Sequence, residues 1–502
     1  ALPTVEAQNR FRLVLQQFLA VFASKEHPLT LFLDDMQWAD AASLQLVEHL
    51  LTHPDTRYLL LIAAYRDNEV GVIHPLMASV DAIRYSGTAV DEIRLIPLPA
   101  AQLNRLLADV LHAQEAVCEP LTHLVFERTG GNPFFFTQFL DSLHKEGLLR
   151  WNAHKRVWQW DLDKIKAKDF TGNVVDLMVD KLRLLPMQVQ GLLQLAACVG
   201  NKFDLRTLAL ISGASEAQSW QHLSAAIHEN LIAYTDGVYK FLHDRIQQAA
   251  YSLIPEERRG EVHLSIGRAL MAGMSADELT EHIFNVTNQL NLGVALLADR
   301  EEKARVAELN LIAGRKAKSS AAYASACRYL AAGMALLDES DWEDRYRLAF
   351  DLCLERANCE FLLSNFDTVK QLIGVLLERG VSKTDLAAAY RLKLVVHDLI
   401  GEYSQAVDSA LTCLRLFGID LPRHPSDEQV RQEYEMVWHN LDGRPIESLI
   451  DLPQLADPEM QAAMDIFPAV QTSAFFSGDT GLNLCYLLLC RNVNLSMKHG
   501  LT

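Results

Sequence analysis

The residues with the clearest chemical potential are two neighbouring acids at the end of an apolar run. Residues 29–33 read Leu-Thr-Leu-Phe-Leu, and Asp34 and Asp35 follow them directly. A nucleotide hydrolase needs one carboxylate to hold the water shell of Mg²⁺ and a second to orient or deprotonate the attacking water. Because acids at strand ends also serve as turn residues or helix caps, the pattern suits both catalysis and a structural role.

Arg66 ends a second apolar run of strand length. Residues 59–65 are Leu-Leu-Leu-Ile-Ala-Ala-Tyr, and Arg66 is the first charged residue after them. Beside the first run, a guanidinium at this place can bind phosphate oxygens in a bidentate manner. The alternative is an arginine that pairs with Asp67 or Glu69 at the edge of the sheet.

Two helix starts carry polar residues that suit both capping and ligand binding. Gly131, Asn132 and Pro133 end one helical pattern and open another, and an asparagine cap followed by proline explains this without a ligand. His243 stands where a hairpin pattern gives way to a helix, which it can cap together with Asp244. The residues alone therefore leave both roles open.

The first segment, about residues 1–150, must position the acids and Arg66. Its apolar runs are 29–33, 59–65 and 92–99. Continuous apolar runs that alternate with helical patterns predict a parallel sheet covered on both faces. From Ala100 to about Gly147 the pattern is wholly helical, which predicts a helical lid.

The second segment, residues 151–255, begins with a Trp-rich stretch that predicts a hairpin or an extended excursion. Helices are predicted at 173–184, 186–198, 203–211 and 216–229. Two short β-prone runs then flank Asp236 and Gly237, a dipeptide that favours a tight type I′ turn. Three helices followed by a two-stranded hairpin is the order of a winged helix.

The third segment, residues 256–420, is helical and shows loose internal repetition at intervals of about 40 residues. Aromatic residues recur near the turn between two helices, at Tyr323, Phe366 and Tyr403. These units resemble tetratricopeptide repeats, which implies an arm that binds protein partners. Residues 421–429 interrupt the helical pattern, and the segment 421–502 is predicted to be a further helical repeat region that is truncated.

The stretch 29–40 carries a resemblance to a known family. It reads Leu-Thr-Leu-Phe-Leu-Asp-Asp-Met-Gln-Trp-Ala-Asp and resembles the Walker B segment of the signal-transduction ATPases with numerous domains (STAND), a branch of the AAA+ class of P-loop ATPases. The resemblance implies that Asp34 is the Mg²⁺-linked acid and Asp35 the acid near the attacking water. Trp38 and Asp40 would brace the turn into the next helix, with Asp40 as its N-cap.

The same resemblance gives roles to the other candidates. Arg66 matches a γ-phosphate sensor at the end of the neighbouring strand. Gly131, Asn132 and Pro133 match a Gly-x-Pro that lies against the adenine. His243 matches a winged-helix histidine that contacts the bound diphosphate. The implied cofactors are ATP or ADP and Mg²⁺.

The resemblance covers nearly the whole chain and has one important departure. It includes large bacterial proteins in which this ATPase lies between a serine/threonine kinase domain and sensor histidine kinase domains, and it is carried by the stretches 131–135, 243–255 and 263–270. No GxxxxGK[ST] motif occurs in the 502 residues, so the chain lacks the loop whose backbone N–H groups and lysine cradle phosphates. We therefore expect a piece truncated from a longer protein, with negligible ATPase activity by itself.

The composition disfavours other classes of function. The chain has 46 Lys and Arg against 64 Asp and Glu, a formal net charge of -18, which repels nucleic acid and anionic lipid. Residues 216–230 include no Lys or Arg, so DNA reading by the winged helix is not expected. No apolar run approaches the roughly 18 residues that cross a bilayer. The eight cysteines lack zinc spacing, which predicts buried reduced thiols of a cytoplasmic protein.

Taken together, these patterns predict an α/β region followed by mostly α structure. The parts are a partial parallel-sheet P-loop ATPase core with a helical lid, a winged-helix unit and a tetratricopeptide-like arm. The predicted function is an ATP-binding regulatory switch of a multidomain bacterial signalling protein kinase, coupled to signals through the repeats. Protein partners are expected through the repeats and through kinase domains outside the chain. The alternative is a non-catalytic interaction scaffold or transcription regulator with an inactive nucleotide site.

Overall fold

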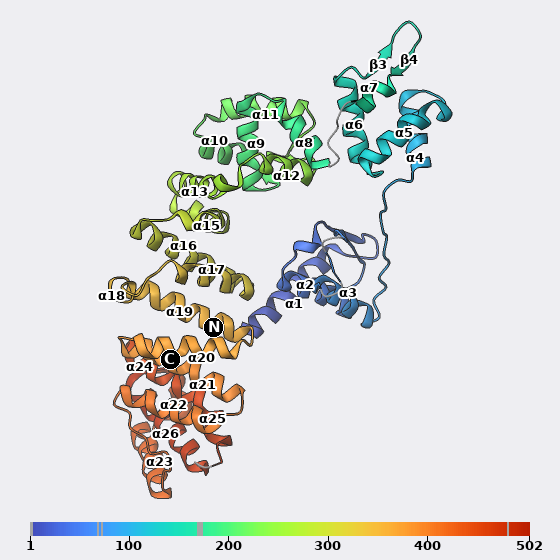
Figure 1. Ribbon diagram of the computed structural model, residues 1–502. Coiled ribbons are helices and arrows are strands. Elements are labelled where there is room, and N and C mark those ends of the chain that lie inside the picture. Colours follow the sequence, from blue (N-terminus) through green and yellow to red (C-terminus); the bar gives the residue numbers. More distant parts are fainter. Residues whose placement is uncertain (1–3, 68–69, 72–73, 168–173, 479–480, 502) are drawn as a thin grey trace. The chain divides into compact units, whose positions relative to one another are not determined.

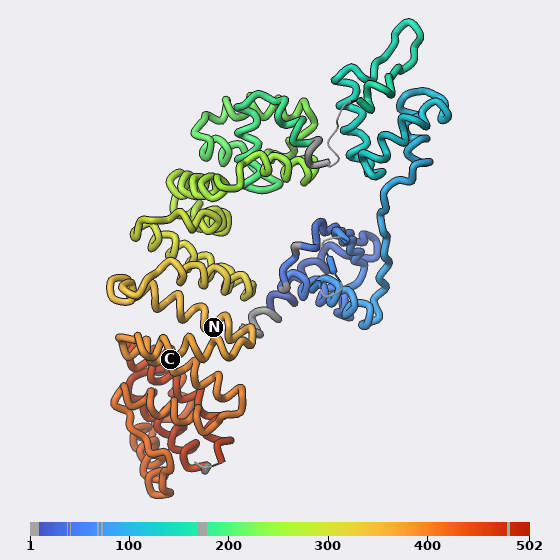
Figure 2. The backbone as a smooth tube through the Cα atoms, in the orientation of Figure 1, coloured from blue at the N-terminus to red at the C-terminus, as the bar shows by residue number. Residues whose placement is uncertain are grey.

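The computed structural model describes residues 4–67, 70–71, 74–167, 174–478 and 481–501. Most of them are helical, as predicted, and the sheets have only two or three strands (Figure 1). The chain divides into two compact units, one formed by Ala1–Thr88 together with Ala298–Thr502 and the other by Ala89–Leu297. Figure 2 follows the backbone through both units.

A small α/β region at the start of the first unit contains the two acids and Arg66. Strands β1 (Leu29–Leu33) and β2 (Leu59–Ala63) pair in parallel and in register along their whole length. The helical elements around them are α1 (Thr4–Phe22), the short turn η1 (Met36–Trp38), α2 (Ala41–Thr52) and α3 (Pro75–Tyr85). The predicted parallel arrangement of the first two apolar runs is therefore observed.

One face of this two-stranded sheet is covered and the other is open. On the covered side Met36, Leu44 and Leu76 form a buried cluster with neighbouring apolar side chains. On the other side Phe32 is 59% exposed and Leu60 is 56% exposed. The expectation of a sheet covered on both faces is wrong for the described residues, because α2 and α3 pack together on the same side.

The third apolar run, residues 92–99, does not form a strand. Ile93 is 85% exposed and Leu95 is 91% exposed. Leu98 donates its N–H to the carbonyl oxygen of Gly131 at 2.9 Å. The prediction of a buried strand is wrong here, because a strand persists only when a neighbour pairs with its backbone. In the described part of the chain no strand pairs with this run.

The second unit is helical from Ala100 to Lys145, as predicted for residues 100 to about 147. Its first elements are α4 (Ala100–Leu111), α5 (Glu115–Thr129), α6 (Pro133–Lys145), the antiparallel hairpin of β3 (Leu149–Asn152) and β4 (Val157–Trp160), and α7 (Leu162–Ala167). Amphipathic spacing on α4 turns Leu103, Leu107 and Leu111 inward, where they join Phe139 of α6 in one core. This core fixes the first turn of α6, which carries the Asn132-Pro133 candidate.

A three-helix region with a small sheet follows in the same unit. Its three helices are α9 (Met187–Val199), α10 (Leu205–Ser212) and α11 (Glu216–His228), and its strands are β5 (Lys202–Phe203), β6 (Ile232–Thr235) and β7 (Val238–Phe241). Two further helices, α8 (Val174–Arg183) and α12 (Asp244–Ser252), flank these elements in the sequence. The strands form an antiparallel sheet in the order β5-β7-β6. Asp236 and Gly237 have φ values of 53° and 84°, the two positive values that a type I′ turn requires. The name winged helix stays a prediction for this region.

Further helices complete the second unit and form the arm of the first. The second unit ends with α13 (Glu256–Gly273), α14 (Ala276–Glu281), α15 (Ile283–Leu292) and η2 (Val294–Leu296). The arm comprises α16 (Arg300–Ser319), α17 (Tyr323–Ala335), α18 (Asp341–Asp344), α19 (Tyr346–Leu362), α20 (Phe366–Arg379), α21 (Lys383–Leu399) and α22 (Tyr403–Leu416). Its last part contains α23 (Asp427–Leu441), η3 (Ile446–Asp451), α24 (Pro458–Met464), α25 (Ile466–Phe476) and α26 (Gly481–His499). Over the described residues, none of the helices combines the length and apolar character needed to span a membrane.

The arm repeats one turn between paired helices. Ala321, Ser364 and Gly401 have positive φ values of 60°, 62° and 80°. In each case one residue follows, with φ near -85°, and the next helix then begins with an aromatic residue. The predicted recurrence of aromatic residues beside turns between helices is therefore observed.

Buried acids tie neighbouring helix pairs of the arm together. Asp385 of α21 accepts hydrogen bonds at 2.8 Å from the Tyr346 hydroxyl and from Arg347, both on α19. Arg315 of α16 donates to Asp351 of α19 at 3.0 Å. These charged pairs lie across helix junctions, so they fix how one helix pair stacks on the next.

Candidate functional site

Asp34 and Asp35 lie at the carboxyl end of β1, on the rim of the parallel pair. Asp34 is exposed, and its Oδ1 accepts the backbone N–H of Asp35 at 3.0 Å. Asp35 has φ 56° and ψ 39°, a left-handed conformation that turns the chain from β1 into η1. This conformation costs a non-glycine residue about 1–2 kcal/mol, and aspartate tolerates it because its short side chain bonds locally. Such strain is often found at functional sites.

Arg66 lies at the corresponding end of β2. The backbone pairing continues past both strands, since the Met36 N–H donates to the Ala64 carbonyl oxygen at 2.9 Å. Arg66 Nε lies 4.0 Å from Asp35 Oδ1, and the two side chains are 31% and 33% exposed. The structure therefore brings Asp35 and Arg66 together at one edge. Glu69, an alternative partner, lies outside the described residues.

Gln37 connects these two residues. Its Nε2 donates to Asp35 Oδ1 at 3.2 Å, and its Oε1 accepts the backbone N–H of Arg66 at 3.3 Å. The side chain is buried, with 6% of Gln37 exposed. The sequence pattern gave Gln37 no role. A usable signal existed, because a buried amide beside a strand end needs partners for both its oxygen and its nitrogen.

Asp40 caps the helix that follows the turn. Its carboxylate accepts the backbone N–H of Ser43 at 2.8 Å at the start of α2. The expected N-cap is therefore confirmed, and it anchors the chain just beyond the two acids. The side chain of Trp38, to which a bracing role was assigned, lies outside the described residues.

Gly131, Asn132 and Pro133 form the start of α6 in the second unit. Asn132 Oδ1 accepts the backbone N–H of Phe134 at 2.9 Å, and Pro133 occupies the first helical position. Gly131 has φ 78°, and a Cβ placed there would lie 2.3 Å from the carbonyl oxygen of Leu98. Only glycine fits this position without a backbone shift.

His243 lies beside the same helix start. Its Nδ1 accepts the backbone N–H of Arg245 at 3.1 Å, so it caps α12. Its ring stacks on Phe134, with centroids 4.4 Å apart and planes at 18°. Phe135 contacts the ring as well, at 5.6 Å. Within the second unit, the structure brings His243 together with the Asn132-Pro133 turn, a contact that the sequence did not predict.

Charged groups continue this junction between α6 and the three-helix region. Lys181 of α8 donates to Gln138 at 2.8 Å and to Asp141 at 3.3 Å, both on α6. Burial lowers the pKa of Lys181, and the nearby Asp141 carboxylate opposes that shift. Lys145 of α6 pairs with Glu229 at the end of α11. The helix that carries the candidate residues is thus held to α8, α11 and α12.

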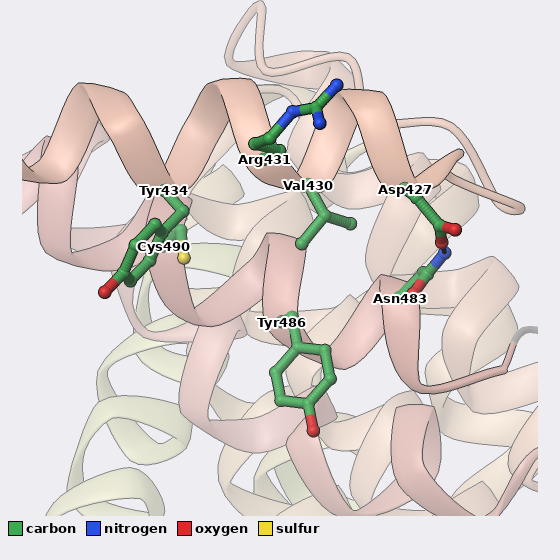
Figure 3. A pocket seen from close by; sticks show the side chains of 7 residues that line it. All are labelled: Asp427, Val430, Arg431, Tyr434, Asn483, Tyr486 and Cys490. Atoms are coloured by element: carbon green, nitrogen blue, oxygen red, sulfur yellow. Dashed lines mark hydrogen bonds between the residues drawn. The ribbon is translucent and has the colours of Figure 1, made fainter.

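A separate pocket lies between α23 and α26 in the first unit (Figure 3). Its volume is about 340 Å³. Its described lining residues are Asp427, Val430, Arg431, Tyr434, Asn483, Tyr486 and Cys490. At one end Asn483 donates to Asp427 at 2.7 Å, and Figure 3 shows Tyr434 and Cys490 together at the other. None of the predicted site residues is among these lining residues.

Comparisons with known proteins find one matching domain family and two similar histidine kinases. Residues 1–62 match the AAA ATPase domain family. Hybrid signal transduction histidine kinase G of Dictyostelium discoideum is 24% identical over 643 residues, covering 100% of this chain and 18% of that protein. The peroxide stress-activated histidine kinase mak3 of Schizosaccharomyces pombe is 19% identical over 443 residues, covering 85% of this chain and 18% of that protein. The chain spans less than a fifth of the length of these curated relatives.

Among solved structures, one similar chain is a signal transduction ATPase with numerous domains and a tetratricopeptide repeat sensor, from Pyrococcus horikoshii. The TM-score is 0.36 and the sequence identity 11%, over 94% of this chain and 71% of that chain.

Proposed function

We propose that the AAA ATPase module to which residues 1–62 belong is a nucleotide-dependent switch within a larger signalling protein. The module was predicted from the Walker B-like stretch, and the family match over these residues confirms it. The two relatives are histidine kinases by name, and this chain corresponds to 18% of each. A regulatory module joined to kinase domains elsewhere in the protein accounts for both facts.

The cluster at the carboxyl edge of β1 and β2 carries this proposal. In open α/β sheets, ligands bind outside the carboxyl ends of the strands, which is where Asp34, Asp35 and Arg66 lie. Asp34 would hold Mg²⁺ through its water shell, and Asp35 would orient or deprotonate the attacking water. Arg66 would bind the γ-phosphate, since a guanidinium recognises phosphate oxygens well.

The donors at this edge suit Mg²⁺. Proteins bind this ion through one or two carboxylates together with water and substrate phosphates, not through a cage of protein ligands alone. Asp34 is exposed at the rim, and among the residues that the structure describes no group of three His, Cys, Asp or Glu forms such a cage. When bound, Mg²⁺ would neutralise charge on the phosphates.

The phosphate cradle is the missing part of this site. Because the 502 residues contain no GxxxxGK[ST] motif, the proposal requires residues outside this sequence to supply the cradle. We expect purified residues 1–502 to show negligible ATPase activity. Turnover above background from this chain, measured by phosphate release, would contradict that expectation.

Gly131, Asn132, Pro133 and His243 are proposed to serve the adenine and the diphosphate of the nucleotide. Two of these residues also stabilise the starts of helices, since Asn132 caps α6 and His243 caps α12. The stack of His243 on Phe134 supports a shared role, since it couples the two helix starts. A ligand that contacts either residue would then be sensed by both helices.

The three-helix region and the arm are proposed to couple the nucleotide state to other proteins. We assign the region of α9, α10, α11 and the β6–β7 hairpin to the winged-helix class, acting as a mobile lever and not as a DNA reader. Helix α11 carries no Lys or Arg, and a groove-reading helix needs cations against phosphate. The arm would receive a protein signal and bias two states of the module.

A second candidate function is a protein-interaction scaffold with an inactive nucleotide site. The pocket between α23 and α26 favours it, because Tyr434 and Tyr486, which line it, are each about half exposed. Exposed aromatic side chains gathered around a concavity are typical of protein interfaces. In this second candidate function, the arm binds protein partners and the nucleotide site has no catalytic role.

Replacing Asp35 in a longer form of the protein that contains a phosphate loop tests the proposal. We expect Asp35→Asn to bind ATP within about threefold of wild type and to lose about 10²–10⁴-fold in turnover. Binding is measured by calorimetry and turnover by phosphate release. Asp40→Asn is the matched control, since asparagine caps a helix as well as aspartate does and should change neither quantity.

Two outcomes separate the candidates. Normal turnover in Asp35→Asn would refute the catalytic role of Asp35. Absence of turnover in the wild-type protein, despite an intact phosphate loop and bound ATP, would favour the scaffold.

A further inference from the structure

A buried glutamine ties the two strand ends of the candidate site together. Gln37 contacts Asp35, just before it in the chain, and Arg66, which lies 29 residues further on. Both contacts are hydrogen bonds of the side-chain amide, and Gln37 is 6% exposed. Asp35 and Arg66 are about one-third exposed, so Gln37 is the buried anchor beneath two solvent-accessible groups.

The chemistry of the partners fixes which way the amide points. The Asp35 carboxylate only accepts hydrogen bonds, so it must face the amide nitrogen. The Arg66 backbone N–H only donates, so it must face the amide oxygen. A flipped amide would oppose two oxygens at one end and two N–H groups at the other. Gln37 therefore has one orientation that satisfies both neighbours.

We propose that Gln37 is a positioning residue, which holds the Asp35 carboxylate in a fixed orientation relative to Arg66. This inference rests on the proposed ATPase function. Gln37 restrains Oδ1 of Asp35, the same oxygen that lies 4.0 Å from Arg66 Nε, and so it limits rotation of the carboxylate. A general base has to stay within about 0.5 Å and 10–20° of its productive geometry.

The amide also couples the two strand ends. Because Gln37 Oε1 accepts the backbone N–H of Arg66, a shift of that backbone moves the anchor of Asp35. Binding of phosphate oxygens by the Arg66 guanidinium would therefore act on the orientation of Asp35. Neither Leu nor Glu can reproduce this arrangement, since Leu makes no hydrogen bond and Glu has no donor for the Asp35 carboxylate.

Steady-state kinetics on the longer protein that contains a phosphate loop test this inference. We expect Gln37→Leu to lower kcat about 10–100-fold, the usual cost of removing a supporting partner, while KM for ATP stays within about threefold. Gln37→Glu keeps the size of the side chain but has no donor for the Asp35 carboxylate, so we expect it to lower kcat by a similar factor while KM for ATP again stays within about threefold.

Gln16→Leu is the matched control. Gln16 is as buried as Gln37, at 7% exposure, and its side chain bonds to His53 Nδ1 at 2.8 Å in the same unit. If Gln37 were only structural, both leucine variants would lower the thermal unfolding temperature and neither would change kcat. We expect kcat to fall only in the Gln37 variants.

Failure of this inference can be told from failure of the proposed function. If Asp35→Asn keeps normal turnover, the proposed function itself is refuted. If Asp35→Asn loses turnover while Gln37→Leu keeps the wild-type kcat, only the role of Gln37 is refuted. Should Gln37→Leu fail to fold, Gln37→Glu decides, and a wild-type kcat in that variant overturns the inference.

Discussion

Replacing Gly131 by alanine should destabilise the helical part of the second unit that surrounds it. Gly131 is buried, has φ 78°, and its carbonyl oxygen accepts a hydrogen bond from the Leu98 N–H at 2.9 Å. A Cβ at this position would lie 2.3 Å from the Leu98 carbonyl oxygen and 3.1 Å from a ring carbon of Phe126. The Leu98 oxygen belongs to the backbone, so it cannot rotate away as the end of a side chain could.

Two physical terms set the size of the effect. An alanine held in the left-handed conformation costs about 1–2 kcal/mol. Forcing an extra carbon into a packed contact costs about 1–3 kcal/mol more. Together they give a loss of about 2–5 kcal/mol for Gly131→Ala. Gly130→Ala is a close control, because Gly130 has φ 57° but nothing within 4 Å of an added Cβ. Gly130→Ala should therefore lose only the cost of the left-handed conformation, about 1–2 kcal/mol.

Hydrogen exchange read by mass spectrometry suits this comparison, since a chain of several units does not unfold in a single two-state step. We expect Gly131→Ala to speed exchange in peptides from α4, α5 and α6, with much smaller changes in Gly130→Ala. Peptides from α16–α22 serve as an internal reference. Equal exchange in the two variants would refute the close approach of the Leu98 backbone to Gly131.

Three further expectations concern contacts elsewhere in the chain. A double-mutant cycle of local unfolding free energies with Phe134→Leu and His243→Asn should show a coupling of about 0.5–1.5 kcal/mol, because the two rings stack. Additive effects of the two substitutions would contradict the stack. Asp40→Ala should destabilise α2 by about 1 kcal/mol through loss of its cap, measured by exchange of the α2 amides, and an effect as small as that of Asp40→Asn would speak against the cap. Burial raises the pKa of Asp385, but hydrogen bonds from Ser382, Tyr346 and Arg347 outweigh burial and leave the pKa below its ordinary value. The stabilisation from this lowered pKa is therefore present above about pH 4 and lost as the pH falls through the folded value. The difference in thermal unfolding temperature between wild type and Asp385→Asn should therefore shrink below about pH 4. A difference that stays constant with pH would contradict the lowered pKa of Asp385.

Much of the fold could be predicted from local sequence patterns. The apolar runs ending at Leu33 and near Ala63 became the paired strands β1 and β2 because each is short, apolar and flanked by helices. The Asp236-Gly237 dipeptide marked its turn because few other residues adopt two successive positive φ values. Residues 92–99 show the limit, since an apolar run does not reveal whether a neighbouring strand is available to pair with it.

The candidate site was predictable only in part. Parallel strands place their carboxyl ends at one edge, so the proximity of Asp35 and Arg66 follows from sequence once the strands are assigned. The bridge by Gln37 does not follow, because it depends on the left-handed turn at Asp35 and on a contact across 29 residues. The stack of His243 on Phe134 likewise depends on how α6 packs on the three-helix region, which no local pattern encodes.

The open face of the β1–β2 sheet has a practical consequence for work on this protein. Parallel sheets occur almost only with both faces covered, and two strands alone are marginal in water. Phe32 and Leu60 therefore form a water-exposed apolar surface on the strands that end at the candidate site. A tryptophan introduced as Phe32→Trp would fluoresce at long wavelength while its side chain is exposed to water. Its emission would shift to shorter wavelength once other residues cover this face of the sheet. The fluorescence emission spectrum of this variant, recorded in shorter or longer forms of the protein, would then show whether the second face of the β1–β2 sheet is covered.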